Sequence, residues 1–353
     1  MQKTVYLVTG ASGHLGTALC EALHARGENV RALVLPGDAG AARLHADVFY
    51  GNVCDRASLA GFFDVPEGVR SIFVHCAAVI DIGGAPSDMV YAVNVEGTRN
   101  VMQLCLEKAV SRVVYVNSVH ALPPRPFGVV RREVDAYSPD MVEGKYAKSK
   151  AMAASLVQEF VQRGLPAVTV QPSGIIGPYD GGNNYLVAMV IRYLKGKLPA
   201  GVVGGYDFVD VRDVADGILA AAEKGRVGES YLLTGGFYSV REMLGLLASL
   251  TGKRRVPCVP VWLARLAAPF SELHARRKKQ RPLFTAYSLR VLRENARFSH
   301  DKATAELGYR PRGLDETLAD TVSYLRRNGI LGEGGKRRGG RISLGAARPA
   351  PVR

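Results

Sequence analysis

TGASGHLG, at residues 9–16, is the stretch of this sequence that decides its fold. It follows an apolar, β-branched run at residues 4–9 and precedes a helical pattern at residues 15–26, which ends at Gly27. A strand, a glycine-rich turn and a helix in this order predict the first unit of a doubly wound, parallel sheet. The glycines of such a turn let the backbone approach a pyrophosphate, and the helix N-terminus attracts negative charge. The stretch therefore predicts a dinucleotide site.

The glycine spacing is G-x-x-G-x-x-G, one residue longer than the G-x-G-x-x-G dinucleotide fingerprint. The spacing alone is a weak signal, and the position between a strand and a helix supplies the rest of the argument. We expect phosphate at the start of the helix that begins near Leu15. The residues expected to bind the dinucleotide in this turn are Gly10, Ser12, Gly13, His14, Leu15 and Gly16.

The end of the second strand usually distinguishes NAD from NADP. An acid there pairs with the ribose hydroxyls, whereas a nearby arginine accommodates the extra phosphate. Here the predicted strand at residues 30–35 ends in Val34 and Leu35, so neither residue type is in the usual place. Arg31 lies inside the strand and Asp38 in the following loop, and for both a binding role and plain solvent exposure fit the sequence. The choice between NAD and NADP stays open.

Short apolar runs and helical patterns alternate along the rest of the chain. Strands separated by helices predict a parallel sheet covered on both faces, so we assign the α/β class and a Rossmann-type, doubly wound sheet. Predicted strands lie at 4–9, 30–35, 48–50, 71–76, 112–117 and 167–171, and predicted helices at 15–26, 89–109, 152–163, 184–195, 213–224, 240–251 and 314–327.

Three regions are expected along the chain. Residues 1–172 should form mainly the dinucleotide-binding Rossmann domain. Residues 173–331 should form mainly a smaller α+β substrate-binding region that covers the ligand crevice and returns in part to the sheet. Residues 332–353 hold six Lys or Arg against one Glu and are rich in Gly and Pro, a composition typical of a disordered tail.

The overall composition indicates a soluble globular protein. Of its 353 residues 47% are hydrophobic, enough for a large buried core. The five cysteines show neither a C-x-x-C pair nor metal-ligand spacing, which favours reduced thiols and a cytoplasmic location. The first ten residues lack the apolar run of a signal peptide, and no apolar stretch reaches membrane-spanning length.

The formal net charge of +14 raises the question of a nucleic-acid partner. Part of this charge lies in the tail, and no aromatic-interleaved basic groove or zinc-finger spacing supports nucleic-acid binding. A second basic cluster follows an apolar segment at residues 261–270, a combination that fits a membrane surface. A solvated helix end that caps a substrate pocket is the favoured interpretation. The cluster consists of Arg276, Arg277, Lys278, Lys279 and Arg281.

Three residues are candidates for catalysis. Tyr146 and Lys150, in YAKSK, are four residues apart, so on a helix they share one face. An ammonium beside a phenol lowers a pKa that starts near about 10, which makes the tyrosine a useful proton donor. Ser118 follows the predicted strand at residues 112–117 and should project at the carboxyl edge of the sheet, where ligands bind. Its hydroxyl could bond a substrate carbonyl, or it could cap an ordinary turn.

Six motifs occur in order: TGASGHLG, HCAA at 75–78, VNVEGT at 93–98, VVYVNS at 113–118, YAKSK at 146–150 and QPSGIIGP at 171–178. Together they resemble the extended short-chain dehydrogenase/reductase superfamily, of the NAD-dependent epimerase/dehydratase type, over about residues 5–331. The resemblance implies that Tyr146 donates or accepts a proton and that Ser118 orients the reacting oxygen. It implies that Lys150 lowers the tyrosine pKa and binds the nicotinamide ribose.

The resemblance also implies contacts with the adenine, the middle of the cofactor and the nicotinamide. The superfamily more often has Asp where this chain has Asn52, which weakens the adenine contact. The implied pairs are, in that order, Asn52 and Val53, Ala77 and Ala78, and Pro172 and Ser173. Asp210 and Asp213 match a recurrent segment too, and we interpret them as structural carboxylates at a helix start.

The reaction depends on the subgroup of the superfamily that the chain resembles. Sugar-nucleotide epimerases and dehydratases of this superfamily usually carry Tyr-Gly soon after the serine, whereas this chain has SVHALPPRPFG at 118–128. PLFT at 282–285 and ARFSHDKATAELGYRPR at 296–312 are similar to dihydroflavonol-reductase-like and 3β-hydroxysteroid-dehydrogenase-like members. Hydride exchange with a small-molecule secondary alcohol or ketone is therefore the favoured function. A sugar-nucleotide epimerase or dehydratase with the same three residues, and a non-enzymatic dinucleotide sensor, stay open.

Some properties are not decided by the sequence. His14, His75 and His120 lie on separate predicted elements without an acidic cluster, so we expect no metal site. The substrate, the direction of the reaction and the oligomeric state, a homodimer included, stay open.

Overall fold

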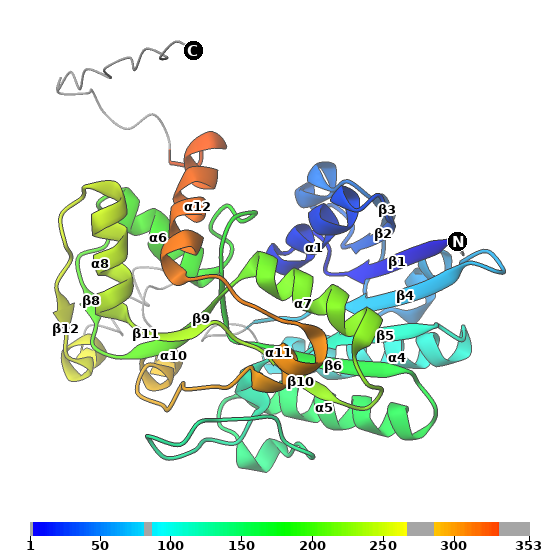
Figure 1. Ribbon diagram of the computed structural model, residues 1–353. Helices are drawn as coiled ribbons and strands as arrows, with labels where there is room; N and C mark the ends of the chain where they lie inside the picture. Colours follow the sequence, from blue (N-terminus) through cyan, green and yellow to red (C-terminus); the bar gives the residue numbers. More distant parts are fainter. Residues whose placement is uncertain (1–2, 81–86, 267–285, 332–353) are drawn as a thin grey trace, which may run out of the picture.

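A seven-stranded parallel sheet forms the centre of the first lobe (Figure 1). The structure is a computed structural model, which describes residues 3–80, 87–266 and 286–331. The strand order is β10-β6-β5-β4-β1-β2-β3, and every neighbouring pair runs parallel, which confirms the predicted fold class. The strands are β1 (Thr4–Thr9), β2 (Asn29–Val34), β3 (Asp47–Tyr50), β4 (Arg70–His75), β5 (Arg112–Val116), β6 (Ala167–Pro172) and β10 (Ser230–Leu233).

The strand order reverses in the middle of the sheet. From β1 the chain winds outward through β2 and β3, and then returns to place β4 on the other side of β1. The carboxyl ends of β1 and β4 lie next to each other, because Thr9 pairs with His75. Ligands of open α/β sheets bind in the crevice beyond the carboxyl ends at such a reversal.

Helices cover both faces of this sheet. Alternate strand residues belong to two separate cores: Val8 packs with the helices of one face and Leu7 with those of the other. Burial on both faces explains why these strands appear as continuous apolar runs in the sequence. The first face carries α1 (His14–Ala25), α7 (Val211–Lys224) and α11 (Asp301–Leu307), and the second carries α2 (Ala60–Phe63), α4 (Thr98–Glu107) and α5 (Lys145–Gln162).

Two predicted helices differ from the observed ones. The single helix expected at 89–109 is divided, because α3 (Ser87–Tyr91) leads through a π-helical stretch, η3 (Ala92–Gly97), into α4. The helix expected at 152–163 begins earlier, at Lys145, so α5 carries the YAKSK segment in its first two turns. Such π-helical stretches occur frequently beside functional sites.

The second lobe lies beside the carboxyl edge of the large sheet (Figure 1). Its core joins three helices to a small sheet in the order β11-β9-β7, and a two-stranded sheet, β12-β8, lies next to it. These elements are β7 (Gly174–Ile176), α6 (Tyr185–Leu194), β8 (Gly201–Val202), β9 (Gly205–Asp210), β11 (Gly236–Ser239), α8 (Val240–Thr251), β12 (Cys258–Val259), α10 (Ala286–Val291) and α12 (Leu314–Arg327).

The chain crosses between the lobes more than once. After Pro172 it builds β7, but α7 and α11 return to cover the large sheet, and β10 joins that sheet at its edge. The division at residue 172 remains a prediction. The tail at 332–353 and the basic cluster at 276–281 lie outside the described residues. Within the described ranges, no helix is long and apolar enough to cross a membrane.

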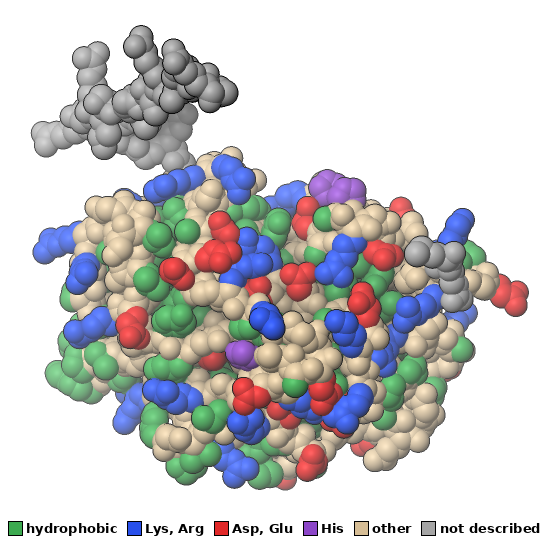
Figure 2. Space-filling model, viewed as in Figure 1, with side chains coloured by type: hydrophobic (Ala, Val, Ile, Leu, Met, Phe, Trp, Pro, Cys, Tyr) green, Lys and Arg blue, Asp and Glu red, His purple; other side chains and the backbone are tan. Residues whose placement is uncertain are grey.

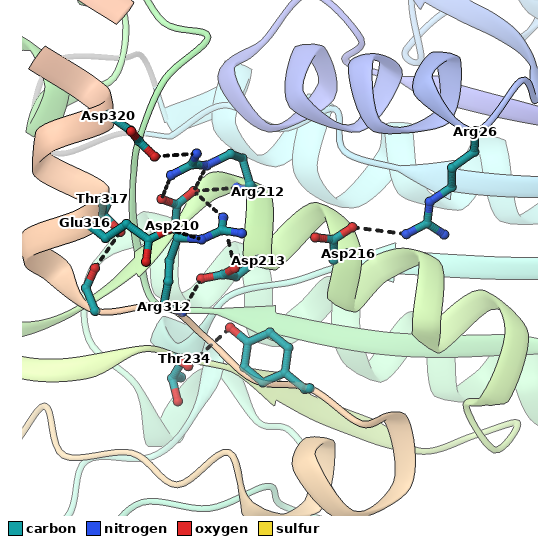
Figure 3. Close-up of polar contacts among 12 residues, drawn as sticks. Arg26, Asp210, Arg212, Asp213, Asp216, Thr234, Arg312, Glu316, Thr317 and Asp320 are labelled. Carbon is teal, nitrogen blue, oxygen red and sulfur yellow. Dashed lines mark hydrogen bonds and ion pairs between the residues drawn. The ribbon is translucent and has the colours of Figure 1, made fainter. Parts of the chain in front are cut away.

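A network of arginines and aspartates joins α12 to the start of α7 (Figure 3). Asp210 caps α7, and both of its carboxylate oxygens accept hydrogen bonds from the Arg212 guanidinium. Arg212 also donates to Asp320 of α12 at 2.7 Å, and Arg312 pairs with Asp213 at 3.1 Å. The structure thus places Asp210 and Asp213 at a helix start, away from the catalytic candidates.

Candidate active site

The glycine-rich turn has the shape that a pyrophosphate requires. Gly10 has a φ of +66°, and a Cβ there would lie 2.7 Å from the backbone nitrogen of Ala77. A Cβ on Gly16 would overlap the carbonyl oxygen of Gly10, so this glycine lets α1 pack against the turn. Gly13 caps α1, and no side chain caps that helix. The uncapped backbone N–H groups of its first turn therefore fit the phosphates of a dinucleotide.

His14 turns its side chain toward the second lobe. Its Nε2 donates to the carbonyl oxygen of Pro178 at 2.8 Å, so its Nδ1 accepts from the Asn184 amide at 3.1 Å. Burial lowers the pKa of His14 and keeps the ring neutral. The Asn184 Oδ1 caps α6. His14 thus offers only its backbone to a phosphate, while its ring links α1 to α6.

Asp38 lies beside the glycine turn. Its carboxylate accepts from the Ser12 hydroxyl at 2.6 Å and from the Gly40 N–H at 2.7 Å. The Ser12 hydrogen bond, followed by that from Gly40, lowers the pKa of Asp38. Arg31 points elsewhere, because its guanidinium donates to three carbonyl oxygens around α2, the shortest at 2.7 Å to Asp64. Of the two residues left open by the sequence, Asp38 is the one at the turn.

Polar side chains hold the segment that follows β4. The Thr9 hydroxyl contacts the Nδ1 of His75 at 2.7 Å and accepts from the Ala77 N–H at 3.3 Å. Asn94, in the π-helical stretch, accepts from the Val79 N–H and donates to the Val79 carbonyl oxygen. Ala77 and Ala78 therefore lie in a fixed segment against Gly10. The VNVEGT motif contained Asn94, but its spacing gave no sign of this role.

The other predicted cofactor contacts lie in separate places. Asn52 is exposed after β3 and accepts from the Cys54 N–H, while Val53 is buried against η3. Ser173 donates to the Oδ1 of Asp207 at 2.5 Å. Burial raises the pKa of Asp207 to about 6, and its hydrogen bonds with Ser173 and the Gly235 N–H act in the opposite direction. Asp207 is thus a buried hydrogen-bond partner of Ser173 that could not be predicted from the sequence.

The structure brings Ser118, Tyr146 and Lys150 together at the carboxyl edge of β5. Ser118 lies two residues beyond the strand and caps a short turn, η4 (Val119–Ala121). Tyr146 and Lys150 lie on one face of α5, and all three side chains are buried. The Lys150 ammonium donates to the carbonyl oxygen of Val116 at 2.8 Å and lies over the Tyr115 ring.

Burial controls the protonation of this cluster. It raises the pKa of Tyr146 to about 12, while a hydrogen bond with the Ser118 side chain acts in the opposite direction. It lowers the pKa of Lys150 to about 8. Desolvation of the phenol dominates, and the Lys150 ammonium faces the Val116 carbonyl oxygen, so a lowering of the Tyr146 pKa by Lys150 stays a prediction. At neutral pH the phenol carries its proton, as a proton donor requires.

His120 completes the site and was missed as a contributor. Its Nε2 and Nδ1 lie 3.0 Å from the hydroxyls of Tyr206 and Tyr287, and its ring meets the Tyr146 ring edge-on at 5.7 Å. Burial lowers the pKa of His120 to about 4, so the ring is neutral. Its place two residues after Ser118 was visible in the sequence, but its two tyrosine partners were not.

A cavity of about 310 Å³ lies behind this histidine. Its walls come from η4, the start of α5, β9, α10 and the segment after α10. Arg131 lies in the wall with its guanidinium over the Phe298 ring, and it donates to the carbonyl oxygens of Leu122 and Asn295. Arg290, also in the wall, pairs with Glu143 and Glu294.

The residues present fit a dinucleotide. Besides the uncapped start of α1, the side-chain amide of Asn117 is buried at the carboxyl edge of β5 without a hydrogen-bond partner on either atom. Buried polar atoms are normally paired, so an unpaired amide beside Ser118 indicates a place for a polar ligand. Among the residues that the structure describes, no group of three or more His, Cys, Asp or Glu side chains could hold a metal ion.

Comparisons with known proteins agree with this geometry. The model of the NAD dependent epimerase/dehydratase family matches residues 6–233. Sterol demethylase protein B of Methylococcus capsulatus is 34% identical, over 92% of this chain and 99% of that protein. A putative dihydroflavonol 4-reductase of Synechocystis is 29% identical, over 92% and 96%. The crystal structure of gox2253 has a TM-score of 0.78 at 33% identity, covering 94% of this chain and 99% of the other.

Proposed function

Because this chain belongs to the NAD dependent epimerase/dehydratase family, we propose that it transfers a hydride between a nicotinamide dinucleotide and a secondary alcohol or ketone. The observation that carries the proposal is the meeting of Ser118, Tyr146 and Lys150 at the carboxyl edge of the sheet whose β1–α1 turn is shaped for a pyrophosphate. The bound cofactor supplies or accepts the hydride.

Each of the three residues has a distinct role in this proposal. In reduction, the hydroxyls of Ser118 and Tyr146 hold the substrate oxygen, and Tyr146 transfers its proton to that oxygen as the carbonyl carbon gains the hydride. In oxidation, the proton returns to Tyr146. The Lys150 ammonium lies beneath them, where it offers a hydrogen-bond donor to the nicotinamide ribose and positive charge to a phenolate.

We further propose that NAD is preferred over NADP. The ionised Asp38 carboxylate is held at the glycine turn by Ser12, just beyond β2. A carboxylate at this place accepts hydrogen bonds from ribose hydroxyls and repels a 2′-phosphate. Arg31, the other candidate, is occupied by carbonyl oxygens around α2.

For the substrate, we propose a bulky and largely apolar ring system that carries the alcohol or ketone. The cavity wall is mostly apolar and aromatic, with Leu122, Val142 and Phe298 among its residues. The names of two relatives, a sterol demethylase protein and a putative dihydroflavonol reductase, support ring-bearing substrates.

A nucleotide-sugar substrate is the alternative, and the charges of the cavity disfavour it. A diphosphate is usually bound by arginines with free donors. Here Arg131 donates to two carbonyl oxygens and Arg290 pairs with two glutamates. The terminal nitrogens of both cavity arginines are therefore engaged within the protein, and only their buried Nε atoms lack a hydrogen-bond partner.

The test combines a substrate panel with one variant. Purified protein is offered ring ketones, their alcohols and nucleotide sugars, and the absorbance of the reduced nicotinamide is followed. Tyr146→Phe should bind NAD normally but lose turnover by about 10²-fold or more, because only the proton donor is removed. Tyr193→Phe, at a buried tyrosine of the second lobe, should keep full turnover.

Two results would contradict the proposal. Full turnover in Tyr146→Phe would remove that residue from the mechanism. Conversion of a nucleotide sugar without net change in the nicotinamide would favour the epimerase alternative.

A further inference from the structure

One end of the second lobe exposes an unusual set of apolar side chains. Residues 261–266 form a short helical segment after β12, and within it Trp262 is 65% exposed, Leu266 64% and Leu263 42%. Ala264, on the opposite side of the segment, is buried in a cluster with Val202 and Leu289. The segment is therefore anchored by one side while its large apolar side chains face outward. Figure 2 shows hydrophobic side chains gathered at lower left, over the region where Figure 1 places β8 and β12.

Cations lie within this segment and also after α8, at the end of that helix away from β12 (Figure 1). Lys253, Arg254, Arg255 and Arg265 are all exposed, and the sequence has no Asp or Glu from Met243 to Ser271. The Tyr193 hydroxyl donates to the Arg254 carbonyl oxygen, which brings the end of α6 to the same region. That end adds two more exposed cations, and the sequence between Asp180 and Asp207 again lacks acids. These two cations are Lys195 and Lys197.

We propose that this surface, defined by Trp262, Leu263, Leu266 and the cations at 253–255, binds the surface of an anionic membrane. Tryptophan and leucine side chains partition into the interfacial region of a bilayer, and cations at the same end of the lobe are attracted to anionic headgroups. A second copy of this chain is a poorer partner, because a symmetric contact would set like charges against each other. The surface thus joins the two chemical features that lipid recognition needs.

The membrane-binding surface lies directly behind the substrate cavity. Leu289 of α10 packs against Ala264 of the exposed segment, while Tyr287 and Arg290 of the same helix line the cavity. Only one helix therefore separates the two. A protein bound in this way holds its cavity close to a bilayer, where an apolar substrate would be concentrated. The binding itself does not depend on the proposed reaction and is tested without substrate.

The chain contains its own reporter for this test, because Trp262 is its one tryptophan. The full-length protein is titrated with vesicles of phosphatidylcholine alone and of phosphatidylcholine with phosphatidylglycerol. Only the anionic vesicles should shift Trp262 emission to shorter wavelength, and lipids brominated on the acyl chains should quench it. Flotation of the same mixtures gives the partition coefficient.

Two variants separate the apolar and electrostatic contributions. Leu263→Ser with Leu266→Ser keeps Trp262 as the reporter. It should weaken partitioning into vesicles about tenfold or more, because the variant loses the free energy gained when two leucine side chains move from water into the bilayer. Lys253→Gln with Arg254→Gln and Arg255→Gln should weaken it about 100-fold on anionic vesicles, at about fivefold per charge.

Matched controls use exposed residues that do not belong to the proposed surface. Phe127→Ser with Val129→Ser removes exposed apolar side chains, and the triple change Lys108→Gln, Lys224→Gln and Arg310→Gln removes three exposed cations. Both should bind as the parent protein does. Equal thermal unfolding of all variants shows that the fold is intact.

Three results would overturn the proposal. One is the absence of an emission shift with anionic vesicles. Another is binding that the double and triple variants leave unchanged, which would assign it to another basic part of the chain. The third is a shift that follows protein concentration without lipid, which would identify a second copy as the partner.

Discussion

Removing the charge of Lys150 should make the protein more stable while it abolishes catalysis. The ammonium is buried with one hydrogen bond, to the Val116 carbonyl oxygen, and a contact with the Tyr115 ring. Burial lowers the pKa of Lys150 from its ordinary value of 10.5 to about 8. The difference of about 2.5 corresponds to about 3 kcal/mol by which folding disfavours the charged form at neutral pH.

Lys150→Met keeps most of the aliphatic volume and removes the charge. The Val116 carbonyl oxygen loses its donor, which costs about 1 to 3 kcal/mol. The net expectation is a gain of about 1 kcal/mol in the free energy of unfolding at pH 7, measured by urea denaturation without dinucleotide. Turnover should be lost in the same protein.

The pH dependence of this stability has a defined sign. Between pH 8 and 10.5 the unfolded chain binds more protons at Lys150 than the folded chain does, so the parent protein gains stability as pH rises. The gain approaches about 3 kcal/mol at the upper end of this range, and Lys150→Met should lack it. The stability advantage of the variant at pH 7 should therefore shrink and then reverse. If Lys150→Met unfolds more easily than the parent at pH 7, or if both respond equally to pH, the reasoning about the buried ammonium is refuted.

Two further changes test the dinucleotide site. Asp38→Asn removes the anion beside Ser12, so it should shift the ratio of kcat/KM for NAD over NADP toward NADP by about tenfold, which corresponds to about 1.4 kcal/mol. Arg31→Gln should leave this ratio unchanged. If Arg31→Gln shifts the ratio and Asp38→Asn does not, Asp38 does not select the cofactor. Gly10→Ala should abolish dinucleotide binding and lower the free energy of unfolding by more than about 2 kcal/mol, because its φ is +66° and its Cβ would meet Ala77. Gly27 has a similar φ of +71°, but a Cβ there would have no atom within 4 Å. Gly27→Ala should therefore lower the free energy of unfolding by only about 1 kcal/mol and keep dinucleotide binding. Calorimetry and dinucleotide titration measure the two effects.

The sequence predicted the large sheet well because its strands are buried on both faces. Residues 4–9 and 167–171 are mainly apolar or β-branched, and six of the seven parallel strands were placed within a residue or two. The strands after Pro172 were not predicted. β8 and β12 have two residues each, and β9 contains Asp207 and Asp210, whose burial depends on distant partners.

In the candidate site, too, residues in local motifs could be predicted, whereas contacts between distant parts of the chain could not. Ser118, Tyr146 and Lys150 lie on two local elements, so their motifs and the helical spacing were enough to predict that they meet. His120 could not be assigned, because Tyr206 and Tyr287 lie 86 and 167 residues further along the chain. The start of α5 was missed because its first turns carry polar side chains that serve the site instead of an apolar stripe.

The aspartate–arginine network of Figure 3 has a consequence for synthesis on the ribosome. Asp213 receives a hydrogen bond from the Arg312 backbone, 99 residues later, and Arg212 binds Asp320, 108 residues later. Until those residues emerge, the Asp213 carboxylate at the start of α7 lacks its cation, and Arg212 has only one of its two carboxylate partners. Since α7 packs against α1, the dinucleotide half of a nascent chain should become fully stable only near the end of translation.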